Sequence, residues 1–265
     1  MSGGEMGRAP AGEEPAPRGE PGALAGEAAG PEGRSSPLHE FALTTILMFT
    51  IVTAIRWLLH PASPLAIGNV RLALLLVGVL AGALVGGLIC SPWGRRSGAH
   101  MNPAVTLALW LLKAFPGRGL AVYAASQLSG SIAGTALARL AWGPAVARVD
   151  YGAVAAGPSW SGWAVFATEG GSLVVITLLI GFFLVRPAHE RWFPWALAVL
   201  IGAIVAVLGP LSGGAANPAR QFGPALLSGT TANLWIYVAA PVAGAVLGAA
   251  VHHLLLRSRR FARPG

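Results

Sequence analysis

Six long apolar stretches alternate with short polar connections from Leu38 onward. They cover about residues 38–59, 66–91, 118–142, 161–185, 192–209 and 233–256. A helix needs roughly 20 predominantly apolar residues to cross the hydrocarbon core of a bilayer. The pattern therefore predicts an all-α membrane protein with six transmembrane helices.

Two shorter apolar runs interrupt this series, and each directly follows an Asn-Pro-Ala tripeptide. The tripeptides are Asn102-Pro103-Ala104 and Asn217-Pro218-Ala219. Asn is a preferred helix N-cap and Pro is favoured at the first helical position. The runs that follow are too short to span a bilayer, so we expect two re-entrant half-helices, which are tolerated at membrane depth only against protein or a water-filled cavity.

The two tripeptides divide the chain into two copies of one pattern. Ser-Gly precedes both in the same frame, and the two Asn positions, 102 and 217, are 115 residues apart. Each copy has two long segments, a half-helix and a third long segment. An odd number of spans places the second copy upside down, which predicts inverted repeats whose half-helices meet near the bilayer midplane.

The composition agrees with this membrane class and removes several others. Of 265 residues, 54% are hydrophobic and 11% are charged, and the mean hydropathy is +0.64. The net charge of +8 is spread along the chain, so we expect no nucleic-acid partner. The single cysteine, Cys90, excludes an internal disulfide framework and a multi-cysteine metal site. We expect no metal and no cofactor.

The Arg and Lys distribution predicts the orientation, because cytoplasmic connections carry an excess of these residues. With both termini inside, ten lie on the cytoplasmic side and five on the outer side. The ten are Arg95, Arg96, Lys113, Arg118, Arg186, Arg191, Arg257, Arg259, Arg260 and Arg263. The five are Arg56, Arg71, Arg139, Arg148 and Arg220.

The two ends of the chain differ from the membrane part. Residues 1–37 are rich in Gly, Pro, Ala and Glu and lack the features of a secretory signal, so they predict a disordered cytoplasmic tail. Residues 38–256 form the expected channel domain, with repeats at about 38–142 and 161–256. Residues 257–265 are expected to form a basic cytoplasmic tail.

Several motifs together resemble the aquaporin family, also called the major intrinsic proteins. They are SGAHMNPAVTL, SGGAANPARQFGPAL, Glu40-x-x-x-Thr44 and Pro241. The resemblance covers about residues 38–256. It implies a plasma-membrane homotetramer in which each protomer has its own pore. The pore would pass water or small uncharged solutes passively and exclude protons and ions. Departures from the family pattern are Ala216, Gln221, and Leu173 four residues after Glu169.

The resemblance also implies roles for residues in the motifs. Asn102 and Asn217 would each present an amide N–H to a passing oxygen, and the positive ends of the two half-helices would repel cations. Arg220 would belong to the outer constriction. A charged side chain at that depth is costly unless it faces a wet path.

The remaining constriction positions can be counted from the motifs. Gly82 lies twenty residues before Asn102, and Val205 and Gly214 lie twelve and three before Asn217. Water-selective members carry an aromatic residue at the first place and His at the second. Their absence predicts a wide constriction that passes glycerol, urea or undissociated metalloid acids. The water-channel-like residues Gln221, Ala225 and Tyr237 support a strictly water-selective channel as the alternative.

Three further residues are expected to support the pore. Glu40 and Glu169 lie in the first helix of each repeat. In the family, the equivalent glutamates accept hydrogen bonds from the loops that lead into the half-helices. The alternative is that a buried carboxylate couples transport to protons or cations. His100 is expected to order its loop, with gating by protonation as the alternative. Cys90 is expected to serve packing. Gly214 stands where mercury-sensitive members carry Cys, so mercurials should not block the pore by that route.

Three other classes of protein compete with the passive channel. An ion-coupled secondary transporter also uses inverted repeats and broken helices, but needs coupling groups along its path. An intramembrane enzyme could be imagined from Ser97 and His100, yet Ser-Gly recurs at Ser212 without a histidine, and turn chemistry explains both copies better. We therefore expect no catalytic residue and no enzyme activity. A junction protein that conducts little remains the third alternative.

Overall fold

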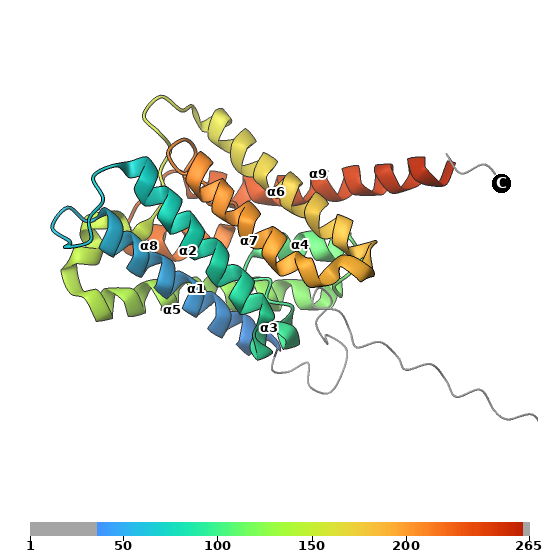
Figure 1. The fold of residues 1–265 in the computed structure, drawn as a ribbon, viewed down its shortest axis with the longest axis horizontal. Coiled ribbons are helices and arrows are strands. Elements are labelled where there is room, and N and C mark those ends of the chain that lie inside the picture. Colours follow the sequence, from blue (N-terminus) through green and yellow to red (C-terminus); the bar gives the residue numbers. More distant parts are fainter. Residues whose placement is uncertain (1–35, 262–265) are drawn as a thin grey trace, which may run out of the picture.

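The computed structural model describes residues 36–261, and within this range every regular element is helical. Figure 1 shows the helices as one elongated bundle. The long helices are α1 (Ser36–Leu59), α2 (Val70–Cys90), α5 (Leu120–Trp142), α6 (Gly162–Leu184), α7 (Phe193–Ala203) and α9 (Leu234–Phe261). The short ones are α3 (Pro92–Ser97), α4 (Pro103–Leu111), α8 (Pro218–Ser228), the 3-10 turns η2 (Gly117–Gly119), η3 (Gly143–Gly152) and η4 (Pro187–Trp192), and the π-helix η5 (Ile204–Leu208).

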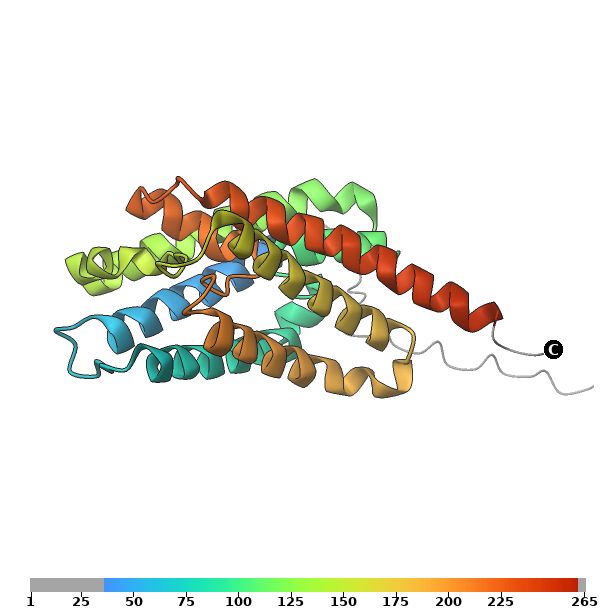
Figure 2. The ribbon, with the colours of Figure 1, turned by 90° about the horizontal axis from the view of Figure 1, so that it is seen from above.

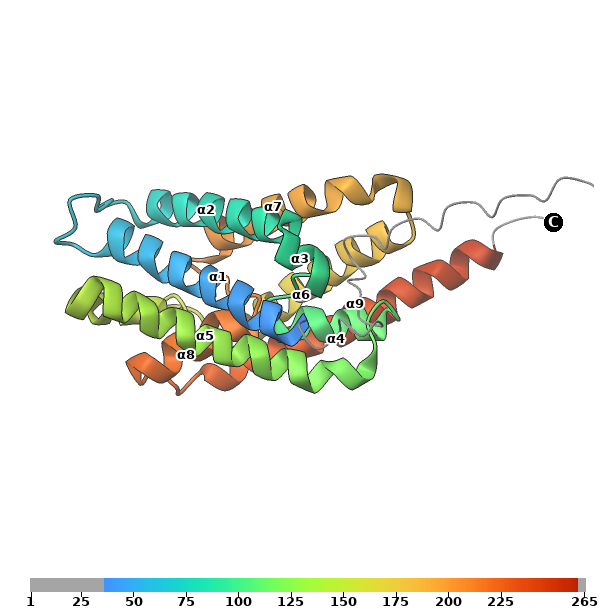
Figure 3. The same cartoon turned by 90° about the horizontal axis from the view of Figure 1, so that it is seen from below.

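Five of the described helical stretches are long and apolar enough to cross a membrane. They are α1, α2, α6, the stretch Pro187–Leu208 that contains α7, and α9. The sixth expected span, α5, has 23 residues and runs beside α1 (Figure 3). It is less apolar because Gln127, Ser131 and Thr135 lie on its buried side. Its polar residues serve the interior of the bundle.

The packing repeats between the two halves of the chain. Within the halves, α1 packs on α5 and α6 packs on α9, and Figure 2 shows the second pair side by side. Between the halves, α2 packs on α7. The half-helix α4 packs against α9, and α8 packs against α5. Each half-helix therefore contacts the third long helix of the opposite repeat, as expected for two halves related by a pseudo-two-fold axis.

Both half-helices begin as predicted at the Asn of the tripeptide. Asn102 Oδ1 accepts hydrogen bonds from the Ala104 amide at 2.9 Å and the Val105 amide at 3.3 Å. Asn217 Oδ1 accepts one from the Ala219 amide at 2.9 Å. In both cases Pro follows at the first helical position. The local capping chemistry that predicted these starts is thus the chemistry that forms them.

The ends of the chain differ in part from the sequence expectation. Helix α9 continues through the expected boundary at residue 256 and ends at Phe261, and Figure 1 shows it projecting beyond the other helices. Most of the expected N-terminal tail, residues 1–35, lies outside the described residues, as do residues 262–265.

Candidate permeation site

The N-termini of α4 and α8 are joined at the centre of the bundle. Asn102 Nδ2 donates to the Ala216 carbonyl at 3.0 Å, and Asn217 Nδ2 donates to the Met101 carbonyl at 2.9 Å. An amide NH₂ group has two N–H donors, so each Asn keeps a second one. Both residues line the two cavities that meet at this point.

The loop that enters α4 is held by the carboxylate of Glu40, which is fully buried in α1. Glu40 Oε1 accepts from Ser97 Oγ at 2.7 Å and from the His100 amide at 2.9 Å. Glu40 Oε2 accepts from the Met101 amide and from Gln127 Nε2, both at 2.7 Å. Met101 has a φ of 47°, a left-handed conformation that costs energy for any residue with a side chain, and these hydrogen bonds offset that cost.

Glu169 holds the loop into α8 in the same way. Its Oε1 accepts from Ser212 Oγ at 2.7 Å and from the Ala215 amide at 3.2 Å. Its Oε2 accepts from the Ala216 amide at 2.7 Å. Ala216, with a φ of 46°, occupies the place of Met101 in the first loop. Both carboxylates therefore face loop donors.

His100 contributes to the loop before α4 and also lines the smaller cavity. Its Nδ1 lies 3.1 Å from Thr106 Oγ1 in the first turns of α4. Its ring packs against the rings of Phe115 and Tyr123, with centroid distances of 5.0 and 5.1 Å, and these two rings also contact each other. The side chain is thus fixed by both polar and aromatic contacts.

A cavity of about 380 Å³ lies on the α8 side of the two Asn residues, and we call it the wide cavity. It contains Val205, Gly214 and Arg220 of the predicted constriction. Residues of α1 and α2 and of the segment 149–155, Tyr151 excepted, line much of the rest of its wall. Among the described residues that line it, none is aromatic and none is a histidine.

A much smaller cavity of about 50 Å³ lies on the opposite side, and we call it the narrow cavity. Its wall includes His100 and the apolar side chains of Leu109, Ile180 and Phe193. Phe193 is the first residue of α7 and packs edge-on against Phe183 with a centroid distance of 5.6 Å. The path is therefore much narrower on this side.

Arg220 projects from the first turn of α8 into the wide cavity. Its Nη1 donates to the Gly152 carbonyl at 2.8 Å, so one edge of the guanidinium is fixed to the loop across the cavity. The remaining N–H groups are left for a solute or for water.

Gly82 lies between α2 and α7, whereas the count back from Asn102 predicts it at the constriction. A Cβ at Gly82 would collide with the backbone carbonyl of Ala198 on α7, so this glycine is a contact between helices. Helix α2 lines the wide cavity through Leu74, Val77, Ala81 and Val85. Val77 adjoins Gly78, which packs on the backbone of Gly202 and Ala206, and both Val77 and Val205 line the wide cavity. Val77 is therefore one of the α2 side chains that could stand at the constriction in place of Gly82.

Gly214 lines the wide cavity, but its missing side chain leaves little extra space. Its φ is 57°, and a Cβ there would lie 2.8 Å from the Ile204 carbonyl and 3.0 Å from the Gly209 amide. Ile204 and Val205 begin the π-helix that continues α7. The wider π turn brings this backbone against Gly214, a feature that no sequence pattern indicated.

Two joined half-helix N-termini with a cavity on either side, inside a bundle of membrane-spanning helices, define a membrane channel. The family model for the major intrinsic proteins matches residues 33–252. The chain belongs to the major intrinsic protein family, and so it is a passive channel for water and small solutes and not an enzyme.

Relatives and solved structures agree with this assignment. The probable aquaporin AqpM of Archaeoglobus fulgidus is 36% identical over 173 residues, covering 62% of this chain and 70% of its own. Aquaporin NIP1-3 of Oryza sativa is 39% identical over 167 residues, covering 61% of this chain and 56% of its own. The X-ray structure of the aquaglyceroporin from Plasmodium falciparum shares the fold, with a TM-score of 0.69, 23% identity, and coverage of 82% of this chain and 94% of its own.

Proposed function

We propose that this channel passes water together with small uncharged polar solutes such as glycerol, urea or undissociated metalloid acids. The observation that carries the proposal is the lining of the wide cavity. Val77, Val205 and the guanidinium of Arg220 all line this cavity, with neither an aromatic ring nor an imidazole among the lining residues described. One cationic donor on an apolar wall suits a solute with hydroxyl or carbonyl groups on an apolar body.

Ion exclusion is proposed to come from the centre of the path. The free N–H groups of Asn102 and Asn217 would orient a passing oxygen and interrupt a proton-conducting chain of water. The N-termini of α4 and α8 add a positive potential, and Arg220 adds a full positive charge nearby, so cations are repelled at two places. Glu40, Glu169 and His100 are proposed to hold the loops that position these groups.

The test is stopped-flow swelling of proteoliposomes under gradients of water, glycerol, urea and boric acid. The wild-type channel is compared with Val77→Phe/Val205→His, which restores the bulk and imidazole that the cavity lacks. We expect the double variant to keep water permeability and lose solute permeability. A wild-type channel that passes water alone would reject the proposed solute range.

Strict water selectivity is the second candidate, and one observation favours it. Backbone atoms occupy the space that a side chain at Gly82 or Gly214 would need, so neither glycine widens the path. The width then depends on the two valines. The single variant Val77→Phe decides between the candidates, because it changes solute flux only if the solute passes that point.

An ion-coupled transporter is disfavoured by the hydrogen bonds of the two buried carboxylates. Glu40 accepts from four donors and Glu169 from three, and all of these donors belong to the protein. Carboxylates satisfied in this way are poor sites for a coupling proton or cation. Solute uptake that stops when an uncoupler is added would revive the transporter.

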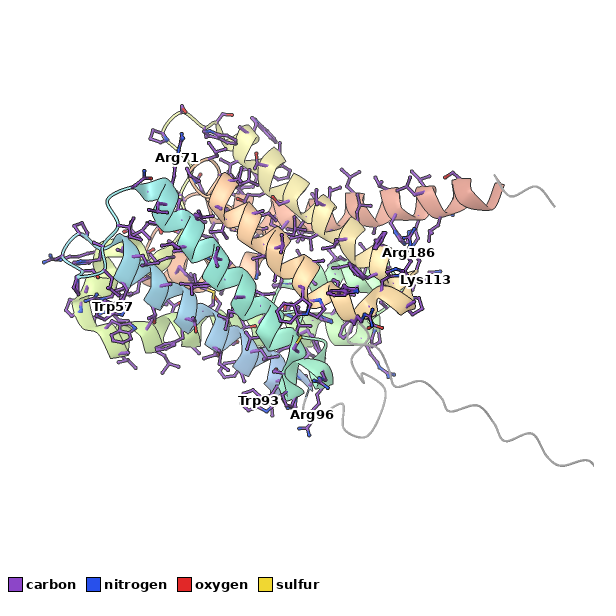
Figure 4. All side chains as sticks on the ribbon, viewed as in Figure 1. Trp57, Arg71, Trp93, Arg96, Lys113 and Arg186 are labelled. Atoms are coloured by element: carbon purple, nitrogen blue, oxygen red, sulfur yellow. The ribbon has the colours of Figure 1, made fainter. Side chains whose placement is uncertain are left out.

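We also propose a plasma-membrane homotetramer with both termini on the cytoplasmic side. Figure 4 shows Arg96, Lys113 and Arg186 at the end of the bundle opposite Trp57 and Arg71, which supports this orientation through the excess of cations on one side. The wide cavity would then open outward. Size-exclusion chromatography with light scattering in detergent would test the assembly, and a monomer of 27.0 kDa would reject it.

A further inference from the structure

The segment before α6 has an unusual backbone where it crosses the mouth of the wide cavity. Asp150, Tyr151 and Gly152 are three successive left-handed residues, with φ of 48°, 55° and 76°. The conformation is unfavourable for Asp and Tyr, so it persists only where neighbouring groups hold it. Gly152 and Val154 from this segment belong to the cavity wall.

Gln221 holds the end of this segment. Its Oε1 accepts from the Val154 amide at 2.8 Å, and its Nε2 donates to the Val154 carbonyl at 3.0 Å. One side-chain amide thus satisfies both backbone polar groups of a single residue. Gln221 is 2% exposed, so water does not compete for these bonds.

The same segment also fixes the constriction. Arg220, the neighbour of Gln221, donates to the Gly152 carbonyl, two residues before Val154. Two consecutive side chains of α8 therefore bind one short segment at two points. The position of the Gly152 carbonyl determines where the guanidinium of Arg220 stands, and the Val154 bonds determine the position of that carbonyl.

We propose that Gln221 is a positioning residue that sets solute selectivity by clamping residues 150–154 across the mouth of the wide cavity. The proposal rests on the permeation function above and adds a residue to it. Gln221 itself is absent from the cavity lining described, so its influence runs through the loop and through Arg220. Without the clamp the segment can relax away from the path, and Arg220 loses its fixed acceptor.

The test replaces Gln221 with Met, which has a similar length and makes neither bond. Two quantities are measured in the full channel in liposomes: hydrogen–deuterium exchange of peptides spanning residues 150–156, and the ratio of glycerol to water permeability. We expect exchange at Val154 to accelerate by about tenfold or more, because two hydrogen bonds are lost. We expect the permeability ratio to rise by about twofold or more.

The matched control is Ser131→Ala. Ser131 on α5 donates to the Ala219 carbonyl and accepts from the Gly223 amide, so this change also removes two hydrogen bonds to α8, neither of which involves residues 150–154. It should lower stability without accelerating exchange at Val154. Gln221→Glu keeps the acceptor and loses the donor. Exchange at Val154 and the permeability ratio should both lie between those of the wild type and of Gln221→Met. This variant serves as the test if Gln221→Met does not fold.

Two results would overturn the proposal. One is faster exchange at Val154 with a wild-type permeability ratio, which would leave Gln221 a purely structural role. The other is an equal effect of Gln221→Met and Ser131→Ala on both quantities. If the wild-type channel passes water alone, the proposed solute range fails, and the role of Gln221 is then decided by exchange at Val154 and by whether Gln221→Met gains glycerol flux.

Discussion

Glycine at position 82 serves the contact between α2 and α7, because its Cα faces the Ala198 backbone. Gly82→Ala should therefore destabilise the channel by roughly 1–3 kcal/mol, the usual cost of forcing extra atoms into a well-packed interior. Thermal unfolding in detergent, followed by tryptophan fluorescence, measures this loss.

Gly87→Ala on the same helix is the control, since nothing lies within 4 Å of a Cβ at Gly87. Its melting temperature should equal or exceed that of the wild type, because Ala is favoured over Gly inside a helix. If Gly82→Ala were as stable as Gly87→Ala and also changed solute flux, Gly82 would belong to the path after all.

The sequence determined some of these residues better than others. Asn102, Asn217 and Arg220 belong to the tripeptides or stand next to them, so a local motif sufficed to locate them. Gly82 was located by counting back across α2 and the loop with α3, and the rotation of a helix twenty residues away does not follow from such a count. Val77 is among the residues that the rotation of α2 presents to the cavity.

At the scale of elements, the meeting of α4 and α8 is the feature that controls charge. Asn102→Asp/Asn217→Asp keeps an oxygen to cap each half-helix but removes both Nδ2 donors and adds two negative charges where the helix N-termini meet. We expect proton or cation conductance to rise roughly tenfold or more, the effect of lining a narrow path with one sign of charge. Water permeability should persist.

A pH-sensitive dye inside proteoliposomes, under a potassium diffusion potential, reports this leak. The single variant Asn217→Asp should leak to an intermediate extent. A double variant as proton-tight as the wild type would show that the exclusion does not depend on these two groups.

As with the residues, some elements could be predicted from the sequence and others could not. The half-helices and five of the long helices could be predicted, because apolar length and Asn-Pro capping are local properties. Helix α5 was also predicted, from its apolar run at about 118–142, although Gln127 and Ser131 make it less apolar. The π-helix and the left-handed segment at Asp150 could not be predicted, since they exist through contacts with Gly214, Arg220 and Gln221.

The whole molecule has one thiol, and its place leads to a simple chemical test. Cys90 is half-buried at the end of α2, and among the described residues it lines neither the wide nor the narrow cavity. Mercurials should therefore leave osmotic water permeability unchanged. Inhibition that disappears in Cys90→Ser would contradict this prediction and would indicate that the end of α2 moves when the thiol is modified.

The unequal volumes of the two cavities, about 380 and 50 Å³, bear on how such a channel could be inhibited. A compound of drug size needs a pocket of roughly 300 Å³ or more. Of these two cavities, the wide one reaches that size and the narrow one does not. With the orientation proposed above, an inhibitor of this channel should act when added to the medium and fail when confined to the lumen of a vesicle that carries the channel in the cellular orientation.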